Sequence, residues 1–123
     1  ATPAGDRRSV VPGNFLQAVP PGAGGYLLSG VVHDWDDERA VTILANCRAS
    51  MARTGRVLVV ECVVPAGDER SFSKLLDLNM LVMNGGRERT KAEFQRLFAA
   101  AGLRMTRVIP TLSPLSIVEG ALP

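Results

Sequence analysis

Two short apolar runs with a helical pattern between them constrain the fold of this chain most. Residues 26–32 and 57–61 are largely continuous in hydrophobic side chains, as is typical of strands buried on both faces of a parallel sheet. From Asp36 to about Met51, apolar residues recur at helical spacing, and Asp36 or Asp37 is available as the N-cap. These apolar residues are Ala40, Ile43, Leu44 and Cys47. The order strand, helix, strand predicts a βαβ unit.

Two further helical patterns follow this unit. Residues 73–83 are apolar at most positions, and the Asn-Gly-Gly sequence at 84–86 ends the pattern. Thr90 and Glu93 have the spacing of a capping box, in which each side chain accepts a hydrogen bond from an unpaired backbone N–H. The helix that they begin has an apolar face, formed by Phe94, Leu97, Phe98 and Ala101. The sequence therefore predicts a second and a third helix.

Two short apolar segments near the C-terminus, 105–109 and 115–118, predict two more strands. The complete order, strand-helix-strand-helix-helix-strand-strand, predicts part of a three-layer α/β sheet. Residues 1–25 are rich in Pro, Gly and Ala and predict a connecting segment. The glycines of residues 21–25 precede a strand, so their amides do not lie at a helix N-terminus, and we do not expect a cofactor loop there.

Composition restricts the partners and the location of this protein. The 123 residues make one domain, with 14 basic and 12 acidic side chains that are scattered along the chain. The net charge of +2 indicates no basic face for nucleic acid or anionic lipid. The longest apolar runs are about five to seven residues, whereas a membrane span needs roughly 20, and no signal-peptide pattern opens the chain. We therefore expect a cytoplasmic protein that binds neither nucleic acid nor membranes.

The two cysteines do not predict a metal site. Cys47 and Cys62 are not in a C-x-x-C arrangement, and the chain has a single histidine to join them, so zinc would have too few soft ligands. Free cysteine is commonly a small core residue, and disulfides are rare in the cytosol. We expect two buried thiols and no metal.

His33, the single histidine, is the strongest candidate for chemistry. It follows the predicted strand 26–32 and precedes the predicted helix. Ligands of open α/β sheets bind beyond the carboxyl ends of the strands. An imidazole with a pKa near 6.5 is mostly a free base at neutral pH, so His33 is suited to remove a proton from a bound hydroxyl. The alternative is that His33 caps the helix or binds backbone.

Carboxylates near His33 would fix its tautomer by accepting a hydrogen bond from one ring nitrogen. Glu61 ends the predicted strand 57–61, and Glu88 follows the Gly-Gly turn. The sequence does not rank these two candidates. Asp34 is adjacent in sequence, but the electrostatics of a helix start explain it equally well, so we leave it out of the catalytic residues.

Five segments share the order and spacing of one known family. They are residues 12–15 (Pro-Gly-Asn-Phe), 26–35 (Tyr-Leu-Leu-Ser to His-Asp-Trp), 59–61 (Val-Val-Glu), 77–80 (Asp-Leu-Asn-Met) and 85–90 (Gly-Gly-Arg-Glu-Arg-Thr). Together they resemble the S-adenosylmethionine-dependent small-molecule O-methyltransferases, which include the plant caffeic-acid type and bacterial enzymes that tailor aromatic antibiotics. The likeness runs from about Val10 to the C-terminus.

The resemblance implies a fold and a place in a larger protein. Residues 1–123 would be the C-terminal half of a Rossmann-like class I methyltransferase sheet, with parallel strands and a final antiparallel strand. The N-terminal dimerisation domain and the glycine loop for the cofactor would lie upstream and are absent here. The full-length protein would be a homodimer that transfers a methyl group from S-adenosylmethionine to a hydroxyl of an aromatic secondary metabolite.

The resemblance also implies roles for individual residues. His33 would be the general base, with Glu61 and Glu88 as flanking carboxylates. The cofactor contacts would be Asn14, Phe15, Ser29 and Trp35. Two features depart from the family: Asn14 stands where Asp is usual, although an amide oxygen still accepts a hydrogen bond, and the frequent Pro before the Gly-Gly pair is missing.

Substrate contacts are expected in the second predicted helix. Met80, Met83 and Asn84 have the spacing of one helix face. Soft, adaptable methionine side chains suit a flat aromatic substrate, and they also serve as core filler. The sequence leaves both readings open.

Two other functions remain compatible with these motifs. A methyltransferase-fold enzyme can use S-adenosylmethionine as a structural or electrostatic element in hydroxylation, decarboxylation or a pericyclic step. Alternatively, the chain is a fragment that acts as an interaction module, because the absent nucleotide-binding half leaves the strand at 26–32 without an inner neighbour.

Overall fold

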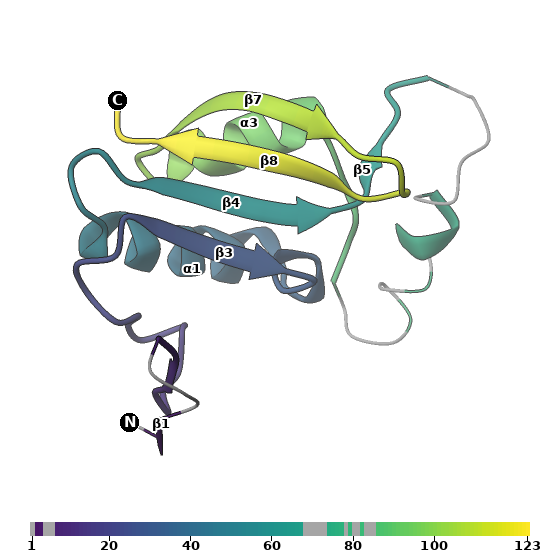
Figure 1. Ribbon diagram of the computed structural model, residues 1–123. Helices are drawn as coiled ribbons and strands as arrows, with labels where there is room; N and C mark the ends of the chain where they lie inside the picture. Colours follow the sequence, from purple (N-terminus) through teal and green to yellow (C-terminus); the bar gives the residue numbers. More distant parts are fainter. Residues whose placement is uncertain (1, 4–6, 68–73, 78, 80–81, 83–85) are drawn as a thin grey trace.

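The computed structural model describes residues 2–3, 7–67, 74–77, 79, 82 and 86–123. At its centre is a four-stranded sheet with the order β3-β4-β8-β7 (Figure 1). The strands are β3 (Gly25–Ser29), β4 (Arg56–Glu61), β7 (Arg104–Pro110) and β8 (Ser116–Ala121). β3 and β4 are parallel, and β8 runs antiparallel to both of its neighbours. The predicted α/β class, the βαβ unit and the antiparallel final strand are therefore confirmed.

Two helices cover one face of this sheet. α1 (Asp37–Ser50) and α3 (Lys91–Ala100) contact each other and lie behind the strands in Figure 1. Asp36 is the N-cap of α1, because its carboxylate accepts a hydrogen bond from the backbone N–H three residues later. Thr90 is the N-cap of α3 and forms the predicted capping box with Glu93. These two helices were correctly predicted.

The core lies between these helices and the inner face of the sheet. Burial alternates along β4, so that Val57 and Val59 pack into the cluster formed by the helices. Val118 of β8 pairs with Val59 and is buried in the same cluster. A Cβ at Gly120 of β8 would lie 2.6 Å from ring atoms of Phe98. Glycine at this position therefore lets α3 approach the sheet.

Two pairs of two-residue strands have no clear pattern in the sequence. β1 (Thr2–Pro3) is antiparallel to β2 (Ser9–Val10), and β5 (Val63–Val64) is parallel to β6 (Arg89–Thr90). In the predicted helix 73–83, all of the described residues are helical, namely 74–77, 79 and 82. In the described part of the chain, no helix combines the length and hydropathy that a membrane crossing needs.

The first predicted strand is shorter than its apolar run. The prediction was 26–32, but β3 ends at Ser29. Gly30 has a φ of 64°, a left-handed conformation that ends the extended chain, and its N–H donates to the Val60 carbonyl at 3.2 Å. The 3-10 helix η1 (Val32–Asp34) follows. His33 therefore lies in a tight helical turn beyond β3 and not directly at the strand end.

Neither α1 nor α3 covers the opposite face of the sheet (Figure 1). Successive residues of a strand point to opposite faces, so Leu27 and its partner Leu58 point away from the core. Leu27 is 65% exposed. Of the predicted three layers, the described residues therefore supply the sheet and one helical layer.

Candidate active site

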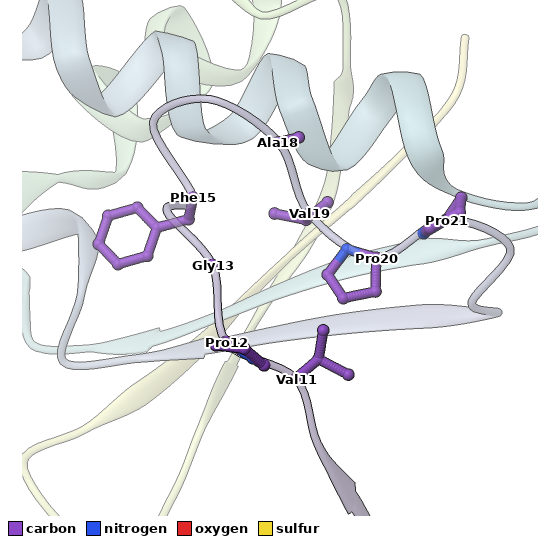
Figure 2. Close-up of a pocket in the computed structure, with 8 residues that line it drawn as sticks. All are labelled: Val11, Pro12, Gly13, Phe15, Ala18, Val19, Pro20 and Pro21. Atoms are coloured by element: carbon purple, nitrogen blue, oxygen red, sulfur yellow. The ribbon is translucent and has the colours of Figure 1, made fainter. Parts of the chain in front are cut away.

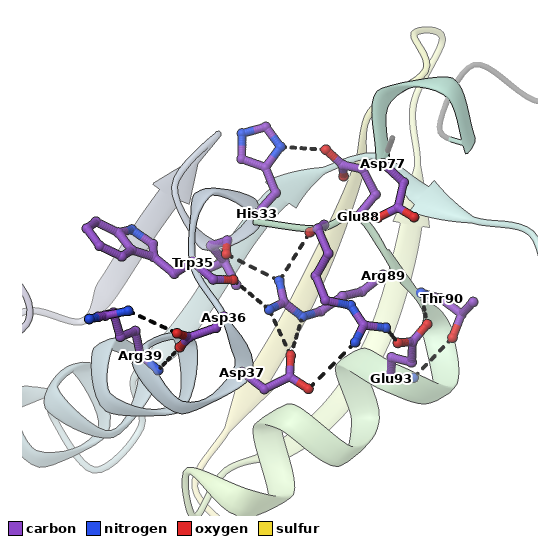
Figure 3. A network of polar contacts seen from close by, with 12 residues as sticks. His33, Trp35, Asp36, Asp37, Arg39, Asp77, Glu88, Arg89, Thr90 and Glu93 are labelled. Carbon is purple, nitrogen blue, oxygen red and sulfur yellow. Dashed lines mark hydrogen bonds and ion pairs between the residues drawn. The ribbon is translucent and has the colours of Figure 1, made fainter. Parts of the chain in front are cut away.

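The three predicted catalytic residues meet at the carboxyl end of the β3–β4 pair. Parallel strands end at the same edge of a sheet, so η1 follows β3 where Glu61 ends β4. The backbone N–H of His33 donates a hydrogen bond to Glu61 Oε1 at 2.9 Å. The segment before β6 brings Glu88 to the same place, with Oε1 2.5 Å from His33 Nδ1 (Figure 3). The sequence predicted this set of residues, and the structure brings them together.

The two glutamates contact different parts of His33. Glu61 holds its backbone, whereas Glu88 holds its ring. When Glu88 is ionised it only accepts hydrogen bonds, so the proton of a neutral imidazole lies on Nδ1 and Nε2 is free to accept another. The sequence left the two carboxylates unranked, and the geometry distinguishes them.

Asp34 approaches the ring nitrogen that Glu88 does not hold. Its Oδ1 lies 3.5 Å from His33 Nε2, and its side chain is 40% exposed. In the sequence alone, Asp34 does not join the catalytic residues, because the electrostatics of a helix start explain an acidic side chain there equally well. In the tight turn of η1, however, the two side chains come within ion-pair distance.

Burial raises the pKa of both glutamates. Glu61 and Glu88 are each 2% exposed. Loss of hydration disfavours the ionised form, which raises the pKa of Glu61 to about 7 and raises that of Glu88 above its ordinary value, although hydrogen bonds from His33 oppose both shifts. Burial lowers the pKa of His33, but the bond to Glu88 and the charges of Glu61, Glu88 and Asp34 outweigh it and leave the pKa above 6.5. The cluster therefore holds protons more tightly than separate groups would.

One oxygen of each glutamate has no hydrogen-bond partner among the described residues. These atoms are Glu61 Oε2 and Glu88 Oε2, and both are buried. A buried carboxylate oxygen without a partner is costly, which favours either its protonation or a contact with a polar group of a ligand.

The same cluster has the shape of a small metal site. His33, Glu61 and Glu88 each offer one ligand atom, and these atoms lie within 4.8 Å of one another. The bond between the ring and Glu88 explains the arrangement without an ion. The expectation that the protein uses no metal stays a prediction.

Two of the residues expected to contact the cofactor, Phe15 and Trp35, contact each other. The rings of Phe15 and Trp35 are in edge-to-face contact, with centroids 6.0 Å apart. The Asn14 Oδ1 accepts a hydrogen bond from the Leu16 N–H at 3.0 Å, which leaves a second lone pair and the NH₂ group. Ser29 is the exposed last residue of β3. Aromatic rings and an amide are side chains that suit the flat, hydrogen-bonding base of a nucleoside, so the chemistry of these residues agrees with the adenosine part of S-adenosylmethionine.

A cavity of about 450 Å³ lies beside this region but apart from His33. Figure 2 shows the loop that encloses it, which runs from Val11 to Pro21 and includes Phe15. The residues that line it are apolar and carry no titratable group. It can therefore bind an apolar surface but offers no group for acid–base chemistry.

The residues expected to contact the substrate are Met80, Met83 and Asn84. All three lie outside the described residues.

Two important residues of the site carried no separate signal in the sequence. Arg89 is 1% exposed and contacts backbone on both sides of His33 (Figure 3). At Gly86, a Cβ would lie 2.0 Å from the His33 carbonyl oxygen. Both belong to the segment 85–90, which carries part of the family resemblance. Nothing in the sequence around Arg89 indicates that its side chain is buried. Gly86 belongs to a Gly-Gly pair after a helix, a pattern that predicts only a turn.

Comparison with known proteins identifies the family. The model of the O-methyltransferase domain matches residues 2–104. The phenazine O-methyltransferase PhzM of Lysobacter antibioticus is 52% identical over 115 residues, which cover 94% of this chain and 34% of that protein.

Two solved structures are similar to this chain. CalO1, a methyltransferase in calicheamicin biosynthesis in its SAH-bound form, matches with a TM-score of 0.91 and 47% identity, over 96% of this chain and 35% of that one. NcsB1, an O-methyltransferase from neocarzinostatin biosynthesis in complex with SAM and 2-hydroxy-5-methyl naphthoic acid, matches with a TM-score of 0.81 and 45% identity, over 92% and 33%.

These matches confirm the resemblance seen in the sequence. The chain spans about a third of the length of the relatives. Because the family model covers most of the chain and the relatives are closely similar in sequence and structure, the chain belongs to the O-methyltransferase domain family.

Proposed function

We propose that this chain is the C-terminal part of an S-adenosylmethionine-dependent enzyme that methylates a hydroxyl group of a small aromatic secondary metabolite, with His33 as the general base. One observation carries the proposal: the single histidine is held through Nδ1 by the buried Glu88, which leaves Nε2 to accept a proton. The names of the relatives support the substrate class, since they include a phenazine methyltransferase and an enzyme with a bound naphthoic acid.

The cofactor would bind beside the turn of His33. When bound, S-adenosylmethionine supplies a methyl group attached to a positively charged sulfur. In this chain, Phe15 and Trp35 would hold the base through their rings, Asn14 would bind its edge, and Ser29 would add a hydroxyl at the end of β3. These residues act by binding and alignment.

His33 would remove the proton of the acceptor hydroxyl. A phenol with a pKa of about 10 is mostly neutral at pH 7, so the methyl acceptor needs a base. Nε2 takes the proton, and the imidazolium that results is stabilised by Glu88 at Nδ1 and by the nearby charge of Asp34. Glu61 fixes the position of the ring through the backbone N–H of His33.

Methyl transfer tests this proposal directly. The open reading frame that encodes this chain is expressed in full and supplied with methyl-labelled S-adenosylmethionine and hydroxylated phenazines or naphthoates. We expect a labelled methyl ether and one equivalent of S-adenosylhomocysteine. A converted substrate without S-adenosylhomocysteine would instead indicate a reaction in which the cofactor keeps its methyl group.

The His33→Asn variant tests the base. Asparagine can still donate a hydrogen bond to Glu88 but cannot act as the base, so the rate is expected to fall about 10²- to 10⁴-fold. The matched control is Arg96→Gln on the exposed side of α3, which should keep the wild-type rate. An undiminished rate in His33→Asn would reject the role of His33.

The proposal includes a homodimer in the cytoplasm. The buried free thiols of Cys47 and Cys62 agree with a reducing compartment. Light scattering of the product of the full open reading frame would give twice the mass of its chain for a dimer, and cell fractionation would place it in the cytosolic fraction.

A further inference from the structure

A cationic side chain is buried directly beside the turn that carries His33. Arg89 of β6 is 1% exposed, although arginine is almost never fully buried unless it is paired. Its carboxylate partner is Asp37, the first residue of α1, whose side chain is 61% exposed. Asp37 Oδ1 accepts two hydrogen bonds from Arg89, one from Nε at 3.1 Å and one from Nη2 at 2.9 Å.

The remaining hydrogen bonds of Arg89 are with backbone carbonyls. One is with the Arg87 carbonyl, to which Nη1 donates at 3.4 Å, and the others lie on both sides of His33. Nη1 donates to the Val32 carbonyl at 3.2 Å, and Nη2 donates to the Trp35 carbonyl at 3.0 Å (Figure 3). Val32 begins η1, and Trp35 is its C-cap. The planar guanidinium therefore spans the two ends of the turn and ties them to the start of α1, which a lysine ammonium on a flexible stem cannot reproduce.

The residues before Arg89 hold the same turn. The Arg87 N–H donates to the His33 carbonyl at 2.8 Å, and Glu88 binds the ring. Gly86 approaches so closely that a Cβ would lie 2.0 Å from the His33 carbonyl oxygen. One stretch of four residues, 86–89, thus contacts the carbonyls of residues 32, 33 and 35 and the imidazole.

We propose that Arg89 is a positioning residue that fixes the turn of η1 so that the His33 ring meets Glu88. The inference rests on the proposed role of His33 as base, but the contact that Arg89 is said to maintain can be measured without any activity. Arg89 acts through the backbone of residues 32 and 35 and touches neither substrate nor cofactor in this account.

Two substitutions separate the charge of Arg89 from its shape. Arg89→Lys keeps the positive charge that lowers the pKa of Glu61 and Glu88. It loses the planar guanidinium whose nitrogens, here called the fork, span the two ends of the turn. Asp37→Asn keeps the fork and removes the exposed carboxylate. Positioning by the fork predicts that Arg89→Lys disturbs His33 and that Asp37→Asn does so much less. Arg96→Met, which removes an exposed arginine of α3, is the control.

The first measurement follows the His33 imidazole in the product of the full open reading frame. In an NMR titration, its signal is assigned by its absence from the His33→Asn variant, and the ring faces the carboxylates of Asp34, Glu61 and Glu88. In the wild type and the control, we expect a His33 pKa above 6.5 and a strongly downfield Nδ1–H resonance from the bond to Glu88. In Arg89→Lys, the resonance should be lost and the pKa should fall toward 6.5.

The second measurement is kinetic and uses the product of the full open reading frame. A misplaced base slows the chemical step more than binding, so Arg89→Lys should lower kcat roughly 10- to 100-fold while the KM for S-adenosylmethionine changes less than threefold. A purely structural role would lower the melting temperature and leave kcat per folded molecule unchanged.

The outcomes of the two measurements are separable. If Arg89→Lys is folded and keeps both the downfield resonance and the raised pKa of His33, the positioning role is overturned. If Arg89→Lys is unfolded, Asp37→Asn decides, because a lost resonance there would assign the positioning to the ion pair and contradict the role of the fork. If His33→Asn retains full activity, the proposed function fails, while the titration still decides whether Arg89 orients the ring.

Discussion

At the scale of single residues, the raised pKa of Glu61 makes the stability of this chain depend on pH. Its folded-state value of about 7 lies above the ordinary 4.5, so the folded chain binds more protons than the unfolded chain between these values. The contribution of this group to stability is complete below pH 4.5 and is lost as the pH rises through 7. The raised pKa of His33 changes stability in the same direction, since the stability that His33 contributes is also lost as the pH rises.

The substitution Glu61→Gln should reduce this dependence. An amide oxygen still accepts the hydrogen bond from the His33 N–H but does not ionise, so the variant avoids the cost of a buried charge at high pH. We expect the unfolding free energy of the wild type to fall by on the order of 1–3 kcal/mol more than that of the variant between pH 5 and pH 8. Denaturant titrations at the two pH values measure the difference. Glu38→Gln, at an exposed position of α1, is the control, and equal slopes for wild type and Glu61→Gln would contradict the argument.

Glu61 also contributes to the pH dependence of the proposed reaction, together with Glu88 and Asp34. Its negative charge is one of the causes that raise the pKa of His33 above 6.5. The base is therefore fully available only above that pKa, and kcat/KM should rise with pH through it. Glu61→Gln should move this rise to lower pH. A rise that stays at the same pH would show that another group controls the profile.

The residues that cluster around His33 could be selected from the sequence, but their arrangement could not be predicted. Glu61 ends β4 and His33 follows β3 in η1, and because the two strands end at the same edge of the sheet, their order along the chain brings these residues together. Which glutamate holds the ring depends on the path of the segment before β6, which no periodicity encodes. The burial of Arg89 could not be predicted for the same reason, since it follows from how η1 and β6 meet.

At the scale of elements, the capping box is the clearest case in which a few neighbouring residues determine where a helix begins. The Thr90 Oγ1 accepts from the Glu93 N–H, and the Glu93 carboxylate accepts from the Thr90 N–H, both at 3.2 Å. α3 begins directly after the segment that holds η1. A weaker cap therefore lowers the stability of the helix beside the site.

Thr90→Ala should destabilise the chain by about 1 kcal/mol, because the first turn of α3 loses its side-chain acceptor. The matched control is Thr42→Ala in the interior of α1, where the hydroxyl donates to the Glu38 carbonyl and alanine is the better helix former. Thermal unfolding monitored by circular dichroism compares the two. Equal losses in both variants would contradict a specific role of the cap.

The end of β3 illustrates what the apolar pattern leaves out. Residues 26–32 read as one strand because Val31 and Val32 continue the run, yet the chain turns at Gly30, whose positive φ ends the extended conformation. Val32 is buried all the same, in a turn instead of a strand. Hydrophobicity thus predicted burial correctly, and the backbone conformation of one glycine changed the element.

At the scale of the whole molecule, the proposed cofactor contacts join two parts of the chain that are distant in sequence. Phe15 lies in the loop around the apolar cavity, and Trp35 follows η1. Asn46 of α1 holds this loop, because its Nδ2 donates to the Phe15 carbonyl at 2.8 Å. The helix therefore positions the loop relative to the turn of His33.

Trp35→Leu should weaken binding of S-adenosylhomocysteine about tenfold in the product of the full open reading frame, because an aromatic contact is worth about 0.5–1.5 kcal/mol beyond its buried area. Calorimetry measures the affinity, and Leu112→Ala at a fully exposed site is the control. Unchanged affinity in Trp35→Leu would remove this residue from the proposed cofactor site.

The layers of the molecule were only partly predictable. The order of strands and helices predicts an α/β sheet, and the parallel and antiparallel pairs confirm it. Sequence order does not say which face a helix covers, and α1 and α3 both cover the same one. The exposed side chain of Leu27 on the other face is the consequence.

The most direct test of the account is the single-turnover rate of methyl transfer to one phenolic acceptor, measured for wild type and His33→Asn at pH 7 and at a pH near the pKa of the acceptor. If His33 removes the proton, the variant should be at least about a hundredfold slower at pH 7, and the gap should narrow at high pH, where the phenol ionises without a base. Equal rates at pH 7, or a gap that does not change with pH, would contradict the central claim.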